Sequence, residues 1–192
     1  MIDRFDDAGR AVVVKDYAPR PWPIRLLLGP WHLDREERAY ALLRGAPGIP
    51  SFLGRLDRQA IALDHVAGRP LAACGRGEID AAFFDALERV LVEVHARGVA
   101  HGDLHRHDVI RGEDGRPYVV DFSTALAAGR APDPLLAWLF RQMCRADRRA
   151  AAKLRRLFLP GEDRPLPDRG FLHALGSRLR RRLDRLRGGA RR

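Results

Sequence analysis

The octet His101–Asp108 (HGDLHRHD) is almost entirely polar, yet it lies between two apolar segments. Upstream, apolar residues recur at helical spacing through residues 79–97, and Gly98 supplies a stop for that helix. Downstream, residues 109–111 and 118–121 flank a turn rich in charge and glycine, which predicts a β-hairpin. The octet is therefore predicted to be a loop that joins a core helix to a hairpin.

The predicted hairpin brings two carboxylates together. Asp108 precedes its first strand and Asp121, thirteen residues later, ends its second, so both are expected at one edge. Carboxylate oxygens of this kind hold magnesium, and Asp103 in the loop is placed to accept a proton from a hydroxyl. An isolated His-x-Asp is more often a solvated loop with a buried histidine, but the flanking segments favour a phosphoryl-transfer site.

The N-terminal part is predicted to begin with another hairpin. Residues 5–7 and 11–17 are separated by a short turn cluster, and the second of these segments is rich in valine. Lys15 lies near the end of that strand and is one of only two lysines in the chain. We therefore weigh a phosphate-binding lysine against an ordinary surface lysine on an edge strand.

A helix is predicted next, with Asp34 as its N-cap and Gly45 as its stop. Glu36 precedes the apolar residues Ala39 and Tyr40 by three and four positions, so it is expected to face the core. A buried carboxylate needs a cation, and Lys15 is the only lysine in this half of the chain. An ion pair between Lys15 and Glu36 is the expected result.

Strands are predicted at residues 51–55 and 60–63, followed by an extended segment from Asp64 to Leu71. The backbone of this segment is suited to binding the edge of a flat heterocycle. We place a boundary here, between an N-terminal unit at residues 1–66 and a second unit at 67–160. Residues 161–192 are predicted to be a loop and a basic amphipathic helix.

The C-terminal part is predicted to be helical. Asp133 is expected to cap one helix, with Pro134 in its first turn, and Asp147 to cap another that runs to Phe158. In the last 15 residues, 178–192, eight Arg and one Asp give a charge of +7, out of +10 for the whole chain. This tail is interpreted either as a docked helix with a solvated Arg face or as a surface for an anionic partner such as lipid head groups.

Composition narrows the functional class. The sequence has no apolar run of membrane-spanning length, so we expect a cytoplasmic protein, and the Arg tail is a feature that could contact the inner face of a membrane. The two cysteines, Cys74 and Cys144, lie far apart and without metal-ligand spacing, so reduced thiols are expected. Nucleic acid is not an expected partner, because the charge outside the tail is close to balanced.

The order of these parts resembles that of the protein-kinase-like superfamily. The shared elements are a strand Lys, a helix Glu, a linker, a His-Gly-Asp-Leu loop and an Asp-Phe pair at Asp121-Phe122. Within that superfamily the sequence looks most like compact bacterial kinases of the lipopolysaccharide-core sugar kinase type and RIO-like serine/threonine kinases, and the resemblance covers most of residues 11–160. It implies an α+β, two-lobed fold with a small antiparallel-sheet N-lobe and a reduced, mainly helical C-lobe.

The resemblance also implies roles for individual residues. Lys15 would hold the α- and β-phosphates of ATP and pair with Glu36, while the Asp64 carbonyl and Val66 amide would contact adenine. Among the loop residues, Asp103 would act as base or orienter of the acceptor hydroxyl, His105 would take the place of the usual catalytic-loop Lys, and Asp108 and Asp121 would bind Mg²⁺. The acceptor hydroxyl would belong to an anionic, lipopolysaccharide-type sugar or to a protein Ser/Thr.

Two other interpretations stay open. Asp108 stands where the kinase pattern has Asn, and no Gly-rich phosphate loop is visible before Lys15. These departures favour a pseudokinase or nucleotide-binding regulatory module with little turnover. A metal-dependent hydrolase built on His101, His105 and His107 is a weaker alternative, because the positions after His107 break the usual ligand string.

Overall fold

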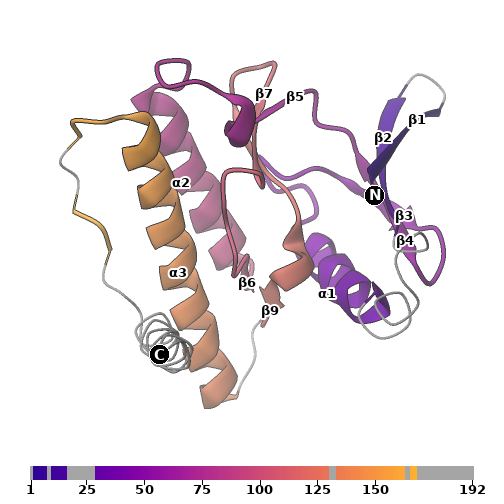
Figure 1. Cartoon of the computed structure of the whole chain (residues 1–192). Coiled ribbons are helices and arrows are strands. Elements are labelled where there is room, and N and C mark those ends of the chain that lie inside the picture. Colours follow the sequence, from indigo (N-terminus) through magenta and orange to yellow (C-terminus); the bar gives the residue numbers. More distant parts are fainter. Residues whose placement is uncertain (1, 8–9, 17–28, 130–132, 163–164, 168–192) are drawn as a thin grey trace, which may run out of the picture.

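The computed structural model describes residues 2–7, 10–16, 29–129, 133–162 and 165–167, and these form an α+β fold with small antiparallel sheets (Figure 1). Strands β1 (Ile2–Asp7) and β2 (Arg10–Asp16) form the first predicted hairpin. Strands β3 (Phe52–Arg55) and β4 (Ala60–Asp64) form the second pair, and the sheet order is β1-β2-β4-β3. Lys15 of β2 lies opposite Ile61 of β4, so the strand lysine is flanked by the buried strand.

Helix α1 (Gly29–Leu42) already includes Asp34 in its interior, so the prediction that Asp34 is its N-cap was wrong. Pro30 is tolerated there because the first turn of a helix needs no N–H donor from that position. Leu33, Glu36, Ala39 and Tyr40 are all buried, at the spacing of one helix face. The inward direction predicted for Glu36 is therefore confirmed.

Two smaller sheets lie between the first sheet and the remaining helices. One has the order β5-β7-β8, formed by β5 (Gly68–Pro70), β7 (Val109–Gly112) and β8 (Pro117–Val119). The other pairs β6 (Val99–Ala100) with β9 (Leu126–Ala127). The 3-10 turns η2 (Leu71–Ala73) and η3 (Phe122–Thr124) complete this part, and the hairpin predicted after the octet is confirmed by the β7–β8 pairing.

Helix α2 (Ala81–Ala96) matches the predicted core helix, and the Asp80 side chain caps it by accepting a hydrogen bond from the Phe83 N–H. Helix α3 (Pro134–Phe158) is a single helix of 25 residues capped by Asp133, where we predicted two helices. Asp147 does not cap a second helix. It is buried in the middle of α3 and accepts hydrogen bonds from the octet loop instead, so no break occurs.

The core joins the sheets to the helices. Tyr40 of α1 packs edge-on against Phe122, with ring centroids 5.3 Å apart, and stacks on Phe52 of β3 at 6.3 Å. Phe84 of α2 is also fully buried and contacts Phe158 at the end of α3. The segments that carry Glu36 and Asp121 therefore rest on one continuous apolar core.

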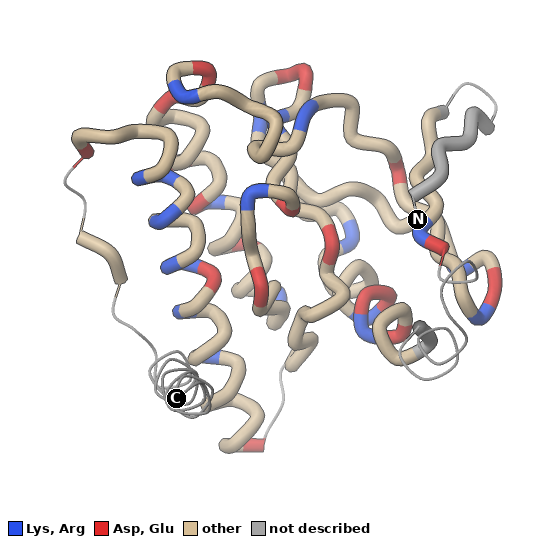
Figure 2. Tube along the Cα trace, viewed as in Figure 1, with Lys and Arg blue, Asp and Glu red and all other residues tan. Residues whose placement is uncertain are grey.

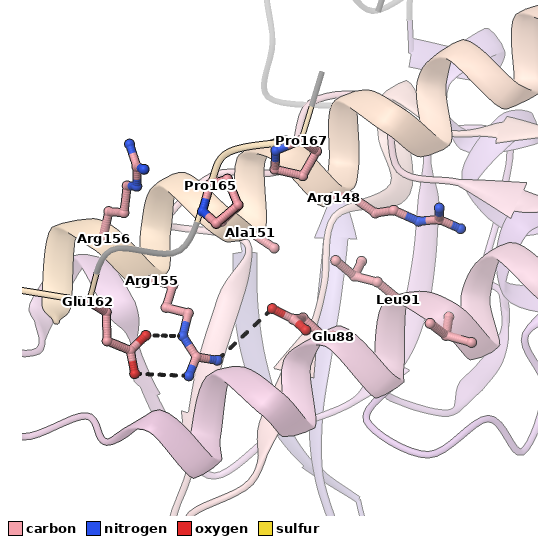
Figure 3. A pocket seen from close by; sticks show the side chains of 11 residues that line it. Glu88, Leu91, Arg148, Ala151, Arg155, Arg156, Glu162, Pro165 and Pro167 are labelled. Carbon is pink, nitrogen blue, oxygen red and sulfur yellow. Dashed lines mark hydrogen bonds and ion pairs between the residues drawn. The ribbon is translucent and has the colours of Figure 1, made fainter. Parts of the chain in front are cut away.

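The chain after α3 is tied back to the helices by Arg155. Its guanidinium binds both oxygens of Glu162, at 2.5 and 3.1 Å (Figure 3). It also binds Asp85 of α2 at 2.6 Å. Beside this cluster a hollow of about 220 Å³ lies between α2 and α3, and Pro165 and Pro167 line it. Glu162, Pro165 and Pro167 thus lie against the two helices. The basic amphipathic helix that we predicted within residues 161–192 would lie beyond Pro167, outside the described residues.

In the part of the chain that the structure describes, no helix combines the length and apolar character needed to cross a membrane.

Candidate functional site

Lys15, Glu36 and Asp121 meet at one point, although they come from three separate segments. The Lys15 ammonium lies 2.8 Å from Oε2 of Glu36 and 2.7 Å from Oδ1 of Asp121. Glu36 is completely buried, whereas the Asp121 side chain is 47% exposed. The predicted pair of Lys15 and Glu36 is present, and the structure adds Asp121 to it.

Charge and burial have opposite effects on the pKa values of the three side chains in this cluster. Burial alone would lower the pKa of Lys15, but the carboxylates of Glu36 and Asp121 outweigh it and raise that pKa above its ordinary value. Burial likewise opposes ionisation of Asp121, yet Lys15 and the hydrogen bonds from Ser123 lower the pKa of Asp121 to about 2. Burial raises the pKa of Glu36, and the Lys15 ammonium works in the opposite direction. At neutral pH the cluster therefore holds a charged lysine against the Asp121 carboxylate.

The backbone at Asp121 is left-handed, with φ of 64°, which is uncommon for a residue other than glycine. Its carboxylate accepts hydrogen bonds from the N–H and the hydroxyl of Ser123, at 3.3 and 2.7 Å. An aspartate tolerates this conformation because its short side chain bonds to the backbone nearby. The turn therefore holds the Asp121 side chain toward Lys15.

A cavity of about 220 Å³, which we call the Lys15 cavity, opens beside this cluster. Its lining includes the charged cluster of Lys15, Glu36 and Asp121, and also the segment of Asp64, His65 and Val66 that follows β4. Its walls are mainly apolar, and they come from Val13, Leu63, Ile110 and Val120 among others. Apolar walls with a few polar groups are typical of a site for a small molecule. The predicted phosphate-binding and adenine-binding residues thus share one cavity.

Asp147 of α3 holds the octet loop through hydrogen bonds to its backbone. One carboxylate oxygen accepts from the His101 N–H at 2.8 Å, and the other accepts from the Gly102 N–H at 2.8 Å. The His95 ring nitrogen Nε2 lies 3.0 Å from the first oxygen. Asp147 is only 1% exposed, so these charge-assisted bonds are shielded from water and fix the loop on the helix.

Two contacts tie the same loop to the segment that carries Asp121. His101 is buried and its Nε2 lies 3.0 Å from the Val120 carbonyl oxygen, so Nε2 carries the proton and donates it. The Thr124 hydroxyl donates to the His101 carbonyl at 3.0 Å. Gly102 has φ of +88°, and a Cβ there would lie 3.0 Å from the Thr124 carbonyl oxygen, so the close approach requires glycine.

Asp103 and His105 lie on the outer side of this loop, where both are exposed. They line another cavity, of about 470 Å³, which we call the Asp103 cavity. The His105 ring nitrogen Nδ1 lies 2.5 Å from Oδ2 of Asp108, and the His105 N–H donates to that oxygen at 3.0 Å. His105 is therefore engaged with Asp108, a contact that the sequence pattern did not reveal.

Asp108 itself is 4% exposed. Burial raises its pKa, the neighbouring Asp121 carboxylate adds to that, and His101 and His105 act against it. Two carboxylates that repel each other at one edge are suited to a divalent cation, and magnesium is usually held by one or two carboxylates together with phosphates and water. The donor set of Asp108 and Asp121 fits Mg²⁺ on these grounds.

The hydrolase alternative needs three or more metal ligands in one place. Among the described residues, no group of three or more His, Cys, Asp or Glu side chains is arranged to hold a metal ion. His101 is engaged with Val120, and the His105 ring is engaged with Asp108. The histidines of the octet therefore do not form a cluster of ligands.

No protein-family model matches the chain. Among curated proteins, a stretch of 89 residues is 27% identical to a 3-deoxy-D-manno-octulosonic acid kinase of Xylella fastidiosa (strain 9a5c). The match covers 46% of this chain and 34% of that protein, so the chain spans about a third of the relative's length. This distant similarity supports a kinase-like relationship in general terms, and the α+β architecture is compatible with it.

Proposed function

We propose that the chain is an ATP-dependent phosphotransferase that adds a phosphate to a sugar hydroxyl, on a reduced two-lobed kinase-like fold. The observation that carries this proposal is the cluster of Lys15, Glu36 and Asp121 in one cavity. A buried carboxylate orients the lysine, and the lysine lies within reach of a second carboxylate suited to magnesium. The similarity to a sugar-acid kinase supports the same assignment.

In this proposal each residue has one task. Lys15, positioned by Glu36, binds the α- and β-phosphates, while the backbone of Asp64 and Val66 contacts adenine in the same cavity. Asp108 and Asp121 would hold Mg²⁺, which supplies charge neutralisation on the phosphates when it is bound.

The transfer step is a displacement at the γ-phosphorus. The acceptor oxygen forms a bond to phosphorus as the bond to the β,γ-bridging oxygen breaks, and ADP leaves. Asp103 accepts the hydroxyl proton, or orients the hydroxyl until that proton is lost. His105, held by Asp108 at 2.5 Å, lies beside Asp103 in the loop and lines the same cavity. Positioning and charge neutralisation make up most of the catalysis.

Transfer from γ-labelled ATP to 3-deoxy-D-manno-octulosonic acid, with Mg²⁺ present, tests this assignment. We expect the wild type to label the sugar, and Asp103→Asn to lower the rate by about 10²-fold or more while ATP still binds. Asp57→Asn is the control, because Asp57 lies in the exposed turn between β3 and β4. Equal transfer by Asp103→Asn and wild type would exclude the assigned role.

A second candidate function is a nucleotide-binding regulatory module with little turnover. It is favoured by the hydrogen bonds that already occupy Asp108, at 2.5 and 3.0 Å from His105 atoms, and by the ion pair between Lys15 and Asp121. A chain that binds ATP with magnesium but transfers no phosphate to any hydroxyl tested would match this candidate.

A further inference from the structure

The Asp103 cavity has two walls of different character. One wall is the octet loop, with Gly102, Asp103, Leu104 and His105. The other wall is a face of α3, and it includes Arg149 and Lys153 together with Gln142, Met143, Ala146 and Ala150. At about 470 Å³ the cavity has twice the volume of the Lys15 cavity, at about 220 Å³, and it is large enough for a sugar.

Helix α3 makes its wall positively charged. Between residues 134 and 158 the sequence has seven Lys and Arg residues and one acid, Asp147. Figure 2 shows these basic residues along the helix. Asp147 is 1% exposed and is engaged with the amides of the octet loop. The positive charge of Arg149 and Lys153, one helical turn apart, is therefore not neutralised by an acid on their own helix.

The Arg149 side chain is fixed by one hydrogen bond, and part of its hydrogen-bonding capacity is left. Its Nη1 donates to the Pro167 carbonyl at 2.5 Å, which fixes the guanidinium. Its Nε is buried and has no hydrogen-bond partner among the described residues. A buried donor without a partner is unfavourable, so the Arg149 guanidinium still has hydrogen-bonding capacity that is not used. Neither Arg149 nor Lys153 forms an ion pair with an acid in the described part of the chain.

We propose that Arg149 and Lys153 bind a negatively charged group, a carboxylate or a phosphate, on the acceptor sugar. This inference rests on the proposed function, because it takes the Asp103 cavity as the acceptor site. An anionic acceptor is repelled by Asp103, and two cations on the opposite wall offset that repulsion and hold the hydroxyl near the carboxylate. The two residues therefore determine specificity for anionic over neutral acceptors.

The matched pair of variants comes from the same helix. Arg149→Gln/Lys153→Gln removes two charges from the wall of the Asp103 cavity. Arg148→Gln/Arg156→Gln removes two charges from the other side of α3, where these residues line the hollow beside Pro165. Both controls are exposed, so the second double variant matches the first in net charge.

The probes are also matched. To test for a carboxylate, binding of 3-deoxy-D-manno-octulosonic acid is compared with binding of its neutral methyl ester. To test for a phosphate, binding of glucose 1-phosphate is compared with binding of neutral glucose. Binding is followed by NMR shift changes without ATP, and KM and kcat are measured with ATP and Mg²⁺. For at least one pair we expect the wild type to prefer the anion by about tenfold or more, and Arg149→Gln/Lys153→Gln to abolish that preference.

The control variant is expected to keep the preference, and the neutral probes are expected to bind all variants alike. The pair that shows the preference identifies the anion as carboxylate or phosphate. Equal binding of charged and neutral probes by the wild type would overturn the inference, as would an unchanged preference in Arg149→Gln/Lys153→Gln. Charge-dependent binding without phosphate transfer would contradict the proposed function and leave the anion site standing, so the two failures are distinguishable.

Discussion

The ammonium of Lys15 lies 2.8 Å from Oε2 of Glu36, a residue with no solvent exposure, across a sequence separation of 21 residues. Lys15→Met would leave this carboxylate buried without a cation. We expect a loss of about 2–4 kcal/mol in the free energy of unfolding at neutral pH, because an uncompensated buried charge is costly. Urea denaturation of the purified variant measures it.

The double variant Lys15→Met/Glu36→Gln separates charge from packing. Glutamine has nearly the same shape as glutamate but no charge, so it should restore about 1–2 kcal/mol relative to Lys15→Met alone. Lys153→Met is the control, since Lys153 is exposed on α3. Additive effects of the two substitutions would show that the pair is not coupled.

Asp147 accepts from two amides of the octet loop, so Asp147→Asn should loosen that loop. An asparagine oxygen replaces one acceptor, but the amide NH₂ then faces a donor, and we expect a loss of about 2–4 kcal/mol. Amide hydrogen exchange at His101 and Gly102 should become faster. The control Asp133→Asn also changes an aspartate of α3, but at its exposed N-cap, and should leave exchange in the loop unchanged.

Asp108→Asn has an effect whose sign depends on pH. The pKa of Asp108 is raised by burial from its ordinary 3.8, so the folded protein binds this proton more tightly than the unfolded chain does. The wild type therefore loses stability as pH rises above about 4, whereas the asparagine variant does not ionise. We expect the variant to be the more stable protein at about pH 7 and to lose that advantage at about pH 3. A variant that is less stable at neutral pH would show that the contact with His105 outweighs the cost of burial.

Glu162→Gln tests whether the ion pair between Glu162 and Arg155 fixes the chain after α3. Glu162 binds the 5%-exposed Arg155 through both oxygens, so removing its charge should loosen the chain around Glu162 and speed proteolysis there severalfold. Glu88→Gln is a close control, because Glu88 lies 4.0 Å from the same guanidinium and is 51% exposed. Equal proteolysis of both variants would show that Arg155 does not hold this segment.

Local sequence patterns were sufficient for much of the fold. Periodicity and turn residues predicted both hairpins, helix α2 and the cap at Asp133, because each of these signals lies within one element. The pairing of Lys15 with Glu36 was also predictable, since an inward carboxylate requires a cation and the N-terminal half offers one lysine. The start of α1 was missed, because the sequence just before Gly29 is three leucines and has no Ser, Thr, Asp or Asn to signal an N-cap.

Long-range contacts of polar residues were not predictable in the same way. The residue type of Asp147 is typical of a helix cap. Its hydrogen-bond partners, however, are amides that lie 45 and 46 residues away in the octet loop. Its one signal was an acid in the middle of an otherwise basic helix. The contact between His105 and Asp108 depends on the loop's conformation, and the cavity between the loop and α3 exists only once both elements are packed.

Binding of ATP with Mg²⁺, measured by calorimetry, tests the central claim most directly. We predict that the wild type binds, that binding weakens without Mg²⁺, that Lys15→Met loses about tenfold or more in affinity, and that Asp103→Asn binds as the wild type does. Absence of ATP binding by the folded wild type, or equal affinity in Lys15→Met, would contradict the account.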